Sequence, residues 1–123
     1  MAEQNGALKI ALGSGDGAAG VLSQLNPEGV NLIITNLVVD VTTKSTGAGT
    51  ADFGVATTAV TNDTLIDGLD VGSAAILADN VTNKGTNGKK SIKWAAGSYL
   101  TGSKATGNMA GLVGSAYVEY VRA

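Results

Sequence analysis

The stretch Val30–Val41 constrains the fold of this chain most, because its apolar pattern changes phase halfway along. Two apolar sets follow each other on opposite parity: Val30, Leu32 and Ile34, then Leu37, Val39 and Val41. Successive side chains of a strand point to opposite faces, so a regular strand would turn one set toward water. One extra residue near Thr35 or Asn36, in a β-bulge, returns both sets to one face. The sequence therefore predicts a long, bent strand.

The composition favours turns and short strands over long helices. The 123 residues include 18 Gly and a single Pro, and only 4% are aromatic. The length is that of one domain, and short alternating apolar segments recur between turn sequences. We expect an all-β fold: an antiparallel β-sandwich, jelly-roll-like, or a barrel, with about seven to eight short strands.

The two ends of the chain are expected to behave differently. Residues 1–18 are predicted to form a flexible, glycine-rich arm that includes a short strand over residues 7–12, and residues 19–123 a single β domain. Residues 111–121 read as a closing strand with apolar side chains on both faces, which is typical of a central strand or of one that meets a neighbouring subunit. We expect removal of the arm to leave the domain folded and to weaken its assembly.

Two internal segments carry local signals. Leu65, Ile66 and Leu69, among Asp and Gly, have the spacing of a helical turn or an irregular crossover. Asn87-Gly88 is a strong signal for a two-residue hairpin turn. Four lysines surround that turn, and we interpret them as a solvated hairpin tip rather than a nucleic-acid patch. They are Lys84, Lys89, Lys90 and Lys93.

Charge and residue types argue against several classes of function. The net charge of −2 gives no broad basic face for phosphates. The absence of Cys and His excludes disulfides, thiol nucleophiles, Cys/His zinc sites and the Ser-His-Asp triad. No segment approaches the ~18 apolar residues of a membrane span, and the start has no signal-peptide pattern. We expect synthesis in a cytoplasm, no enzymatic activity, no cofactor, and no nucleic-acid or membrane partner.

A glycine-rich segment imitates a dinucleotide-binding fingerprint. Gly15-Asp16-Gly17-Ala18-Ala19-Gly20 matches G-x-G-x-x-G, and Asp40 stands where a ribose-binding acid would follow. The fingerprint requires a helix after its third glycine, yet only residues 21–25 separate it from Asn26-Pro27. We therefore interpret the segment as a flexible loop and not as a cofactor site.

Three carboxylates, of Asp63, Asp67 and Asp70, lie close together in the sequence. Such a group can bind Ca²⁺ or, in pairs, act as the acid and base of a glycosidase. Their spacing does not match an EF-hand loop, and Asp is common in turns. We expect them to cap turns, and we predict no catalytic, cofactor-binding or metal-binding residue in the chain. Trp94 alternates with polar residues and is expected in the core.

An ordered set of sequence blocks covers most of the chain from about residue 19 onward: residues 27–30 leading into 32–43, then 46–56, 65–72, 84–89, 94–97 and 111–114. In this order, the blocks resemble small structural proteins of tailed bacteriophages that are encoded with virion head genes. The resemblance implies a capsid decoration or cement protein, made in the host cytoplasm and located on the capsid exterior. Its implied partner is the major capsid protein shell, which it would bind and stabilise. It lends no catalytic residue.

Two further implications belong to this hypothesis. We expect a homo-oligomer, most plausibly a trimer, because several docking sites in one assembly raise its avidity for a shell. A phage tail or baseplate protein of the same fold is the first alternative. The second is a carbohydrate-binding module, for which Trp94, Tyr99, Tyr117 and Tyr120 would supply stacking platforms.

Overall fold

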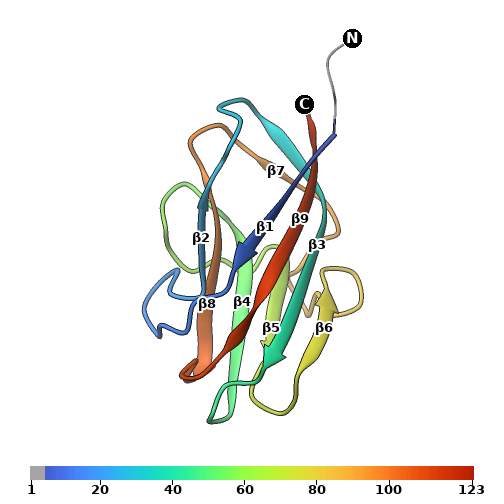
Figure 1. The fold of residues 1–123 in the computed structure, drawn as a ribbon. Helices are drawn as coiled ribbons and strands as arrows, with labels where there is room; N and C mark the ends of the chain where they lie inside the picture. Colours follow the sequence, from blue (N-terminus) through green and yellow to red (C-terminus); the bar gives the residue numbers. More distant parts are fainter. Residues whose placement is uncertain (1–4) are drawn as a thin grey trace.

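The computed structural model describes residues 5–123, which form an antiparallel β-sandwich without helices (Figure 1). This confirms the all-β prediction. The described residues contain nine strands: β1 (Asn5–Ala11), β2 (Leu22–Leu25), β3 (Leu32–Thr43), β4 (Gly49–Ala56), β5 (Ile66–Asp70), β6 (Ile76–Asp79), β7 (Ile92–Trp94), β8 (Tyr99–Gly107) and β9 (Val113–Arg122).

The chain crosses repeatedly between two sheets. One sheet has the order β1-β9-β3-β6, with β7 pairing on β3 as well, and the other has the order β2-β8-β4-β5. β6 and β7 lie one after the other along β3: β6 pairs with Val38–Val41 and β7 with Leu32–Ile34. β9 runs between β1 and β3, so the two-faced closing strand is a central strand, as one of its two readings predicted.

The phase change in β3 is a β-bulge at the predicted place. The pairing with β9 shifts register between Ile34 and Asn36, which makes Thr35 the extra residue. A second shift, which the pattern did not predict, makes Thr42 extra. Both threonine hydroxyls donate to carbonyls of β9, Thr35 to Glu119 at 3.2 Å and Thr42 to Val113 at 3.2 Å. The bulges therefore keep partners while they bend the strand.

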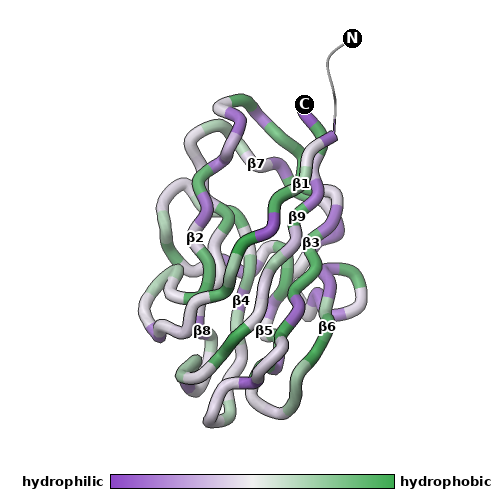
Figure 2. The backbone as a smooth tube through the Cα atoms, in the orientation of Figure 1, coloured by the Kyte–Doolittle hydropathy of each residue, from purple (hydrophilic) through white to green (hydrophobic). Residues whose placement is uncertain are grey.

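The core fills the space between the sheets with aliphatic side chains. All predicted inward residues of β3 except Val30, which precedes the strand and is 48% exposed, are buried: Leu32, Ile34, Leu37, Val39 and Val41. Phe53 on β4 and Trp94 on β7 are fully buried, as expected for Trp94. The hydropathy tube shows hydrophobic stretches along β3 and β9, interrupted by hydrophilic residues (Figure 2). Burial of these side chains is the main source of stability.

Two local predictions are wrong. Residues 66–70 form strand β5 and not a helical turn or irregular crossover. Residues 80–91, around Asn87-Gly88, are not a hairpin turn, because the flanking strands β6 and β7 both pair with β3 instead of with each other. The four lysines around this segment are exposed, so their solvation is confirmed although the hairpin is not.

The 80–91 loop covers the free edge of β5 in the opposite sheet. The Asp67 amide donates to the Lys84 carbonyl at 2.8 Å, and the Lys89 amide donates to the Thr64 carbonyl at 2.8 Å. The loop thus closes one side of the sandwich and occupies backbone groups that an edge strand would otherwise expose.

Much of the segment expected as an arm belongs to the sheet. β1 pairs with β9 over all its residues, from Asn5 opposite Val121 to Ala11 opposite Ser115. Its inward side chains Leu8 and Ile10 are half-buried and pack against the core. Residues 1–4 of the expected arm lie outside the described residues. The described part of the arm therefore contributes to the fold.

Candidate functional site

The outer face of the five-stranded sheet is a candidate functional surface. Because directly opposite residues of antiparallel strands share a face, the register places outward side chains in rows across the sheet. One row runs Ala11, Ser115, Asp40, Leu77, and the next runs Lys9, Tyr117, Val38, Asp79. Leu77 is 72% exposed and Tyr117 39%. We call these two rows, together with Val113 at the start of β9, the outer face.

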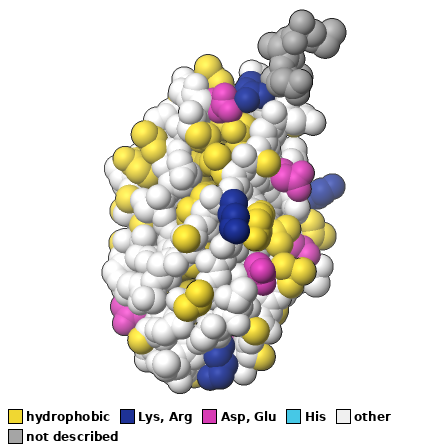
Figure 3. Space-filling model, viewed as in Figure 1, with side chains coloured by type: hydrophobic (Ala, Val, Ile, Leu, Met, Phe, Trp, Pro, Cys, Tyr) yellow, Lys and Arg dark blue, Asp and Glu magenta, His cyan; other side chains and the backbone are white. Residues whose placement is uncertain are grey.

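The outer face mixes apolar and charged groups. The space-filling view shows hydrophobic side chains in small clusters there, separated by single charges (Figure 3). The Lys9 ammonium lies 5.8 Å from the centroid of the Tyr117 ring, within range of a cation–π contact. Such a surface suits docking to another protein better than burial within this one.

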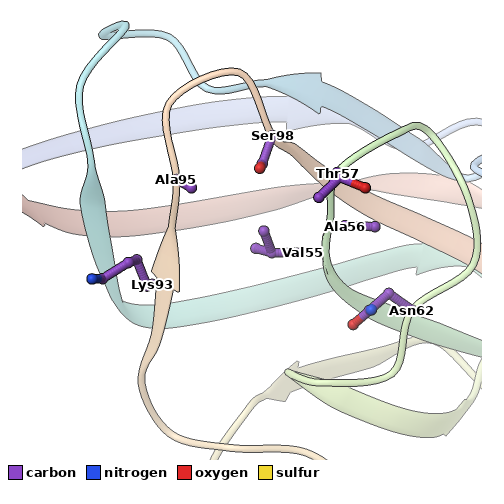
Figure 4. A pocket seen from close by; sticks show the side chains of 7 residues that line it. All are labelled: Val55, Ala56, Thr57, Asn62, Lys93, Ala95 and Ser98. Carbon is purple, nitrogen blue, oxygen red and sulfur yellow. The ribbon is translucent and has the colours of Figure 1, made fainter.

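A shallow depression of about 440 Å³ lies between β4, β7 and the turn that precedes β8 (Figure 4). It is lined by Val55, Ala56, Thr57, Asn62, Lys93, Ala95 and Ser98. The Asn62 side-chain oxygen is already engaged by the amide and the hydroxyl of Thr64, at 3.0 and 2.6 Å. The Lys93 amino group points away from the other six side chains (Figure 4). The depression thus gathers no charged group for a ligand.

Strand β2, and not a helix, follows the glycine-rich loop, as the sequence predicted. The strand–turn–helix context of a dinucleotide fingerprint is therefore not present. The amide of Ala19 donates to the Ser103 hydroxyl at 2.7 Å, and the Asp16 carboxylate accepts from the Met109 amide at 2.7 Å. Asp16 therefore holds the loop against the turn between β8 and β9.

Of the three clustered carboxylates, Asp70 caps its own turn, as predicted, whereas Asp63 and Asp67 bond to the 80–91 loop. Asp70 accepts from the Ser73 hydroxyl at 2.7 Å and from the Gly72 amide at 3.0 Å, and these bonds lower its pKa. Asp63 and Asp67 accept instead from the side chain and the amide of Asn87. Within residues 5–123, no three acidic side chains gather as a set of metal ligands.

A fourth carboxyl group near this cluster, that of Asp52 on β4, has a raised pKa, whereas the pKa of Asp70 is lowered. Partial burial raises its pKa, while the Gly68 amide, which donates to it at 2.8 Å, acts against that rise. The negative charges of Asp67 and Asp63 add to the rise. Asp52 therefore lies within electrostatic range of two other carboxylates.

A charged cluster closes one end of the sandwich. Glu28 accepts from the Arg122 guanidinium at 2.7 and 3.2 Å and from the Tyr120 hydroxyl at 2.8 Å. These bonds, the one from Arg122 first, lower the pKa of Glu28. Burial, followed by the bond to Glu28, raises the pKa of Tyr120. The cluster ties the turn after β2 to the end of β9.

The aromatic residues do not form a stacking platform together. Trp94 is fully buried, donates from its indole nitrogen to the Ser98 carbonyl at 3.0 Å, and meets the Tyr120 ring edge-to-face at 6.2 Å. Tyr120 is 4% exposed, and Tyr99 is half-buried. Of the four aromatic residues considered for carbohydrate binding, Tyr117 is the exposed one.

The sequence predicted the outer face only in part. The apolar second face of β9 was visible as alternation, and it contains Val113 and Tyr117. The sequence does not predict the place of Leu77, because the apolar pattern of residues 74–81 fits a strand and a helical turn equally well. The run Ile76-Leu77-Ala78 was the available signal, but it did not distinguish the inward residue, Ala78, from the outward one.

Comparisons with protein-family models, with curated proteins and with solved structures find no match to this chain. In the part of the chain that the structure describes, no helix is long and apolar enough to cross a bilayer. A functional proposal therefore depends on the sequence blocks, the fold and the outer face.

Proposed function

We propose that this protein is a virion structural protein of a tailed bacteriophage: a capsid decoration protein that binds the shell of major capsid protein from outside and stabilises it. The ordered sequence blocks from about residue 19 onward suggest the virion. The described chain is a sandwich with a long central strand and one side closed by the 80–91 loop, a form suited to an exposed structural role.

The observation that carries the proposal is the outer face. Leu77, Tyr117 and Val113 are exposed there beside Lys9 and Asp40, so apolar contact and charge complementarity are available on one surface. An interface of this mixed kind is typical of proteins that fold alone and then associate. Assembly as a homo-oligomer would multiply the number of docked sites. Sedimentation of the free protein measures the number of copies in such an assembly.

Mass spectrometry of purified particles tests the virion role. We expect the protein in a copy number comparable to that of the shell subunit. Its absence from particles, or a few copies per particle, would rule out a capsid-wide role. The second of these results would instead favour the tail or baseplate alternative.

A binding assay with shells that lack the protein tests the outer face. We expect Leu77→Asp to weaken binding at least tenfold, because it places a carboxylate in the apolar part of the interface. Val60→Asp is the matched control, since Val60 is 45% exposed but lies in the loop between β4 and β5. Equal effects of the two variants would show that the outer face is not the docking surface.

The carbohydrate-binding alternative loses its main residue, since the Trp94 ring is buried in the core. Tyr117 would have to bind a sugar alone among the four aromatics, and Lys9 already lies against its ring. Glycan-array binding abolished by Tyr117→Ala would revive this alternative.

A further inference from the structure

Strand β1 has a free outer edge. It ends the sheet order β1-β9-β3-β6, and among residues 5–123 no strand pairs with its other side. The Leu12 amide donates to the Gly114 carbonyl at 3.0 Å. This bond shows which residues of β1 exchange hydrogen bonds with β9, because such residues alternate along an antiparallel ladder. The even-numbered residues of β1 therefore direct N–H and C=O toward β9, and Ala7, Lys9 and Ala11 direct theirs outward.

This edge lacks the usual protection against pairing. β1 contains no proline, and its ladder with β9 runs without a register shift. A lysine often guards an exposed edge, but the Lys9 ammonium lies over the Tyr117 ring of the same sheet, away from the edge. The edge of β5, by contrast, is covered by the 80–91 loop. The molecule thus closes one side of the sandwich and leaves β1 open.

We propose that β1 pairs antiparallel with β1 of a second copy of this chain, about a twofold axis at Leu8. The two five-stranded sheets would then become one continuous sheet. The outward amide and carbonyl of Ala7 would bond to those of Lys9 in the other copy. The Asn5 amide would donate to the Ala11 carbonyl of the other copy, while the Asn5 carbonyl already accepts from the Arg122 guanidinium of its own chain at 3.0 Å. A twofold contact of this kind is self-complementary and closed, so it yields a dimer and not a fibre.

The side chains favour this register over a shift of the axis to residue 9. With the axis at Leu8, Lys9 faces Ala7 of the other copy, whereas a shift of the axis to residue 9 would set Lys9 against Lys9, which is unfavourable. On the inner side Leu8 meets Leu8, and Ile10 meets the small Gly6. Leu8 and Ile10 are only half-buried in a single copy, so pairing covers the rest of their apolar surface.

Sedimentation of the full chain over a wide concentration range tests the pairing. We expect twice the chain mass at high concentration. Lys9→Pro removes an outward N–H and leaves the bonds to β9 in place, so the dissociation constant should rise about 10- to 100-fold. Lys9→Ala is the matched control: it removes the charge, keeps the N–H, and should dimerise like the parent chain.

Cysteine cross-linking tests the register independently of any proline effect, because the chain has no cysteine of its own. An equimolar mixture of Ala7→Cys and Lys9→Cys chains should form disulfides between unlike chains faster than either forms them alone, since opposite residues lie about 5.5 Å apart at Cα. Thr86→Cys, exposed in the 80–91 loop, reports random collision.

A monomeric chain at high concentration, a mass three times that of the chain, or cross-linking no faster than that of Thr86→Cys would each overturn the twofold pairing. If Lys9→Pro fails to fold, the cross-linking result decides. The virion role is tested on particles and does not depend on these outcomes, so either proposal can fail alone.

Discussion

The side chain of Asn80 takes the place of a missing strand residue opposite Leu37. The side-chain oxygen of Asn80 accepts from the Leu37 backbone amide at 2.9 Å, and the backbone amide of Asn80 donates to the Leu37 carbonyl at 3.1 Å. Its side-chain nitrogen donates to the carbonyls of Lys89 and Lys90 at 2.9 and 2.8 Å. Asn80 is fully buried in the gap between β6 and β7, so one residue satisfies β3 and fastens both ends of the 80–91 loop.

Asn80→Ala should therefore be strongly destabilising. The Leu37 amide would lose its partner in a buried site, and an orphaned buried polar group costs about 1–3 kcal/mol. The carbonyls of Lys89 and Lys90 would lose theirs in a partly buried one. We expect a loss of at least that size in the free energy of unfolding, measured by urea titration. Asn87→Ala is the control, because its side-chain bond to Asp63 is exposed. Similar losses in both variants would argue against the gap-filling role.

Trp94→Ala should lower the free energy of unfolding by roughly 3–5 kcal/mol, since the ring is fully buried against Tyr120. Tyr117→Ala, on the outer face, should cost less than about 1 kcal/mol, the scale of an exposed cation–π contact. Chemical unfolding followed by far-ultraviolet dichroism measures both. A Trp94→Ala chain with parental stability would show that the indole is not a core residue.

The sequence predicts a bulge near Thr35 or Asn36 because apolar residues on both sides mark the change of phase, and the structure places it at Thr35. The sequence does not predict the bulge at Thr42, which comes after the last buried residue of the strand, Val41, so that no later apolar residue records the new phase. A bulge is visible in a sequence only where core residues flank it.

The failure at β5 has the same origin. Ile66 and Leu69 are three residues apart and both buried, which is the spacing of a helix. The ladder with β4 pairs Ala51 with Leu69 and Phe53 with Ile66, so β5 contains one extra residue. Gly68, with φ of 80°, takes the left-handed conformation there. The prediction of a hairpin at Asn87-Gly88 failed for another reason. β6 and β7 both pair with β3, which is distant in the sequence, and a local turn motif carries no information about such long-range pairing.

Gly102→Ala should destabilise the chain by about 1–3 kcal/mol through overpacking. A Cβ atom at this position of β8 would lie 2.7 Å from the Phe53 ring and 2.9 Å from the Leu22 side chain. Gly17→Ala is the matched control in the glycine-rich loop, where a Cβ meets no atom within 4 Å. We expect the control to lie between no change and a gain of about 1 kcal/mol, from the lower entropy of the unfolded chain. Calorimetry compares the melting temperatures of the two variants. A Gly102→Ala chain that melts with the parent would show that the space between the sheets accommodates an extra methyl group.

Glu28 should give the fold part of its acid sensitivity. Its pKa is lowered from the ordinary 4.5 by the bonds from Arg122 and Tyr120, so the folded state holds the ionised form more tightly than the unfolded state does. That stability is present above the unfolded pKa and is lost as the pH falls through the folded one. Glu28→Gln should therefore lower the melting temperature at neutral pH and reduce its fall below pH 4.5.

Asp70 and Asp79 also have lowered pKa values, the first from the Ser73 hydroxyl and the second from the Thr82 amide, so part of the acid slope should survive in the Glu28→Gln chain. Melting curves from neutral to acidic pH measure the difference. Parallel curves for parent and variant would mean that Glu28 is equally ionised in the folded and unfolded chains.

Removal of residues 1–11 tests whether β1 is an arm or a structural strand. The sequence predicts that the domain stays folded without its first eighteen residues. The ladder with β9 and the packing of Leu8 and Ile10 instead predict a loss of roughly 2–4 kcal/mol in the free energy of unfolding. This is about half the burial energy of two fully buried aliphatic side chains, plus the cost of exposing the edge of β9. In the full chain, Ile10→Ser should reproduce part of this loss, whereas Ala11→Ser, on the exposed side of the same strand, should not. A truncated chain that melts with the parent would return β1 to the role of an arm. It would also weaken the case for pairing through its edge, because a strand that is not held against β9 cannot present a fixed edge to a second copy.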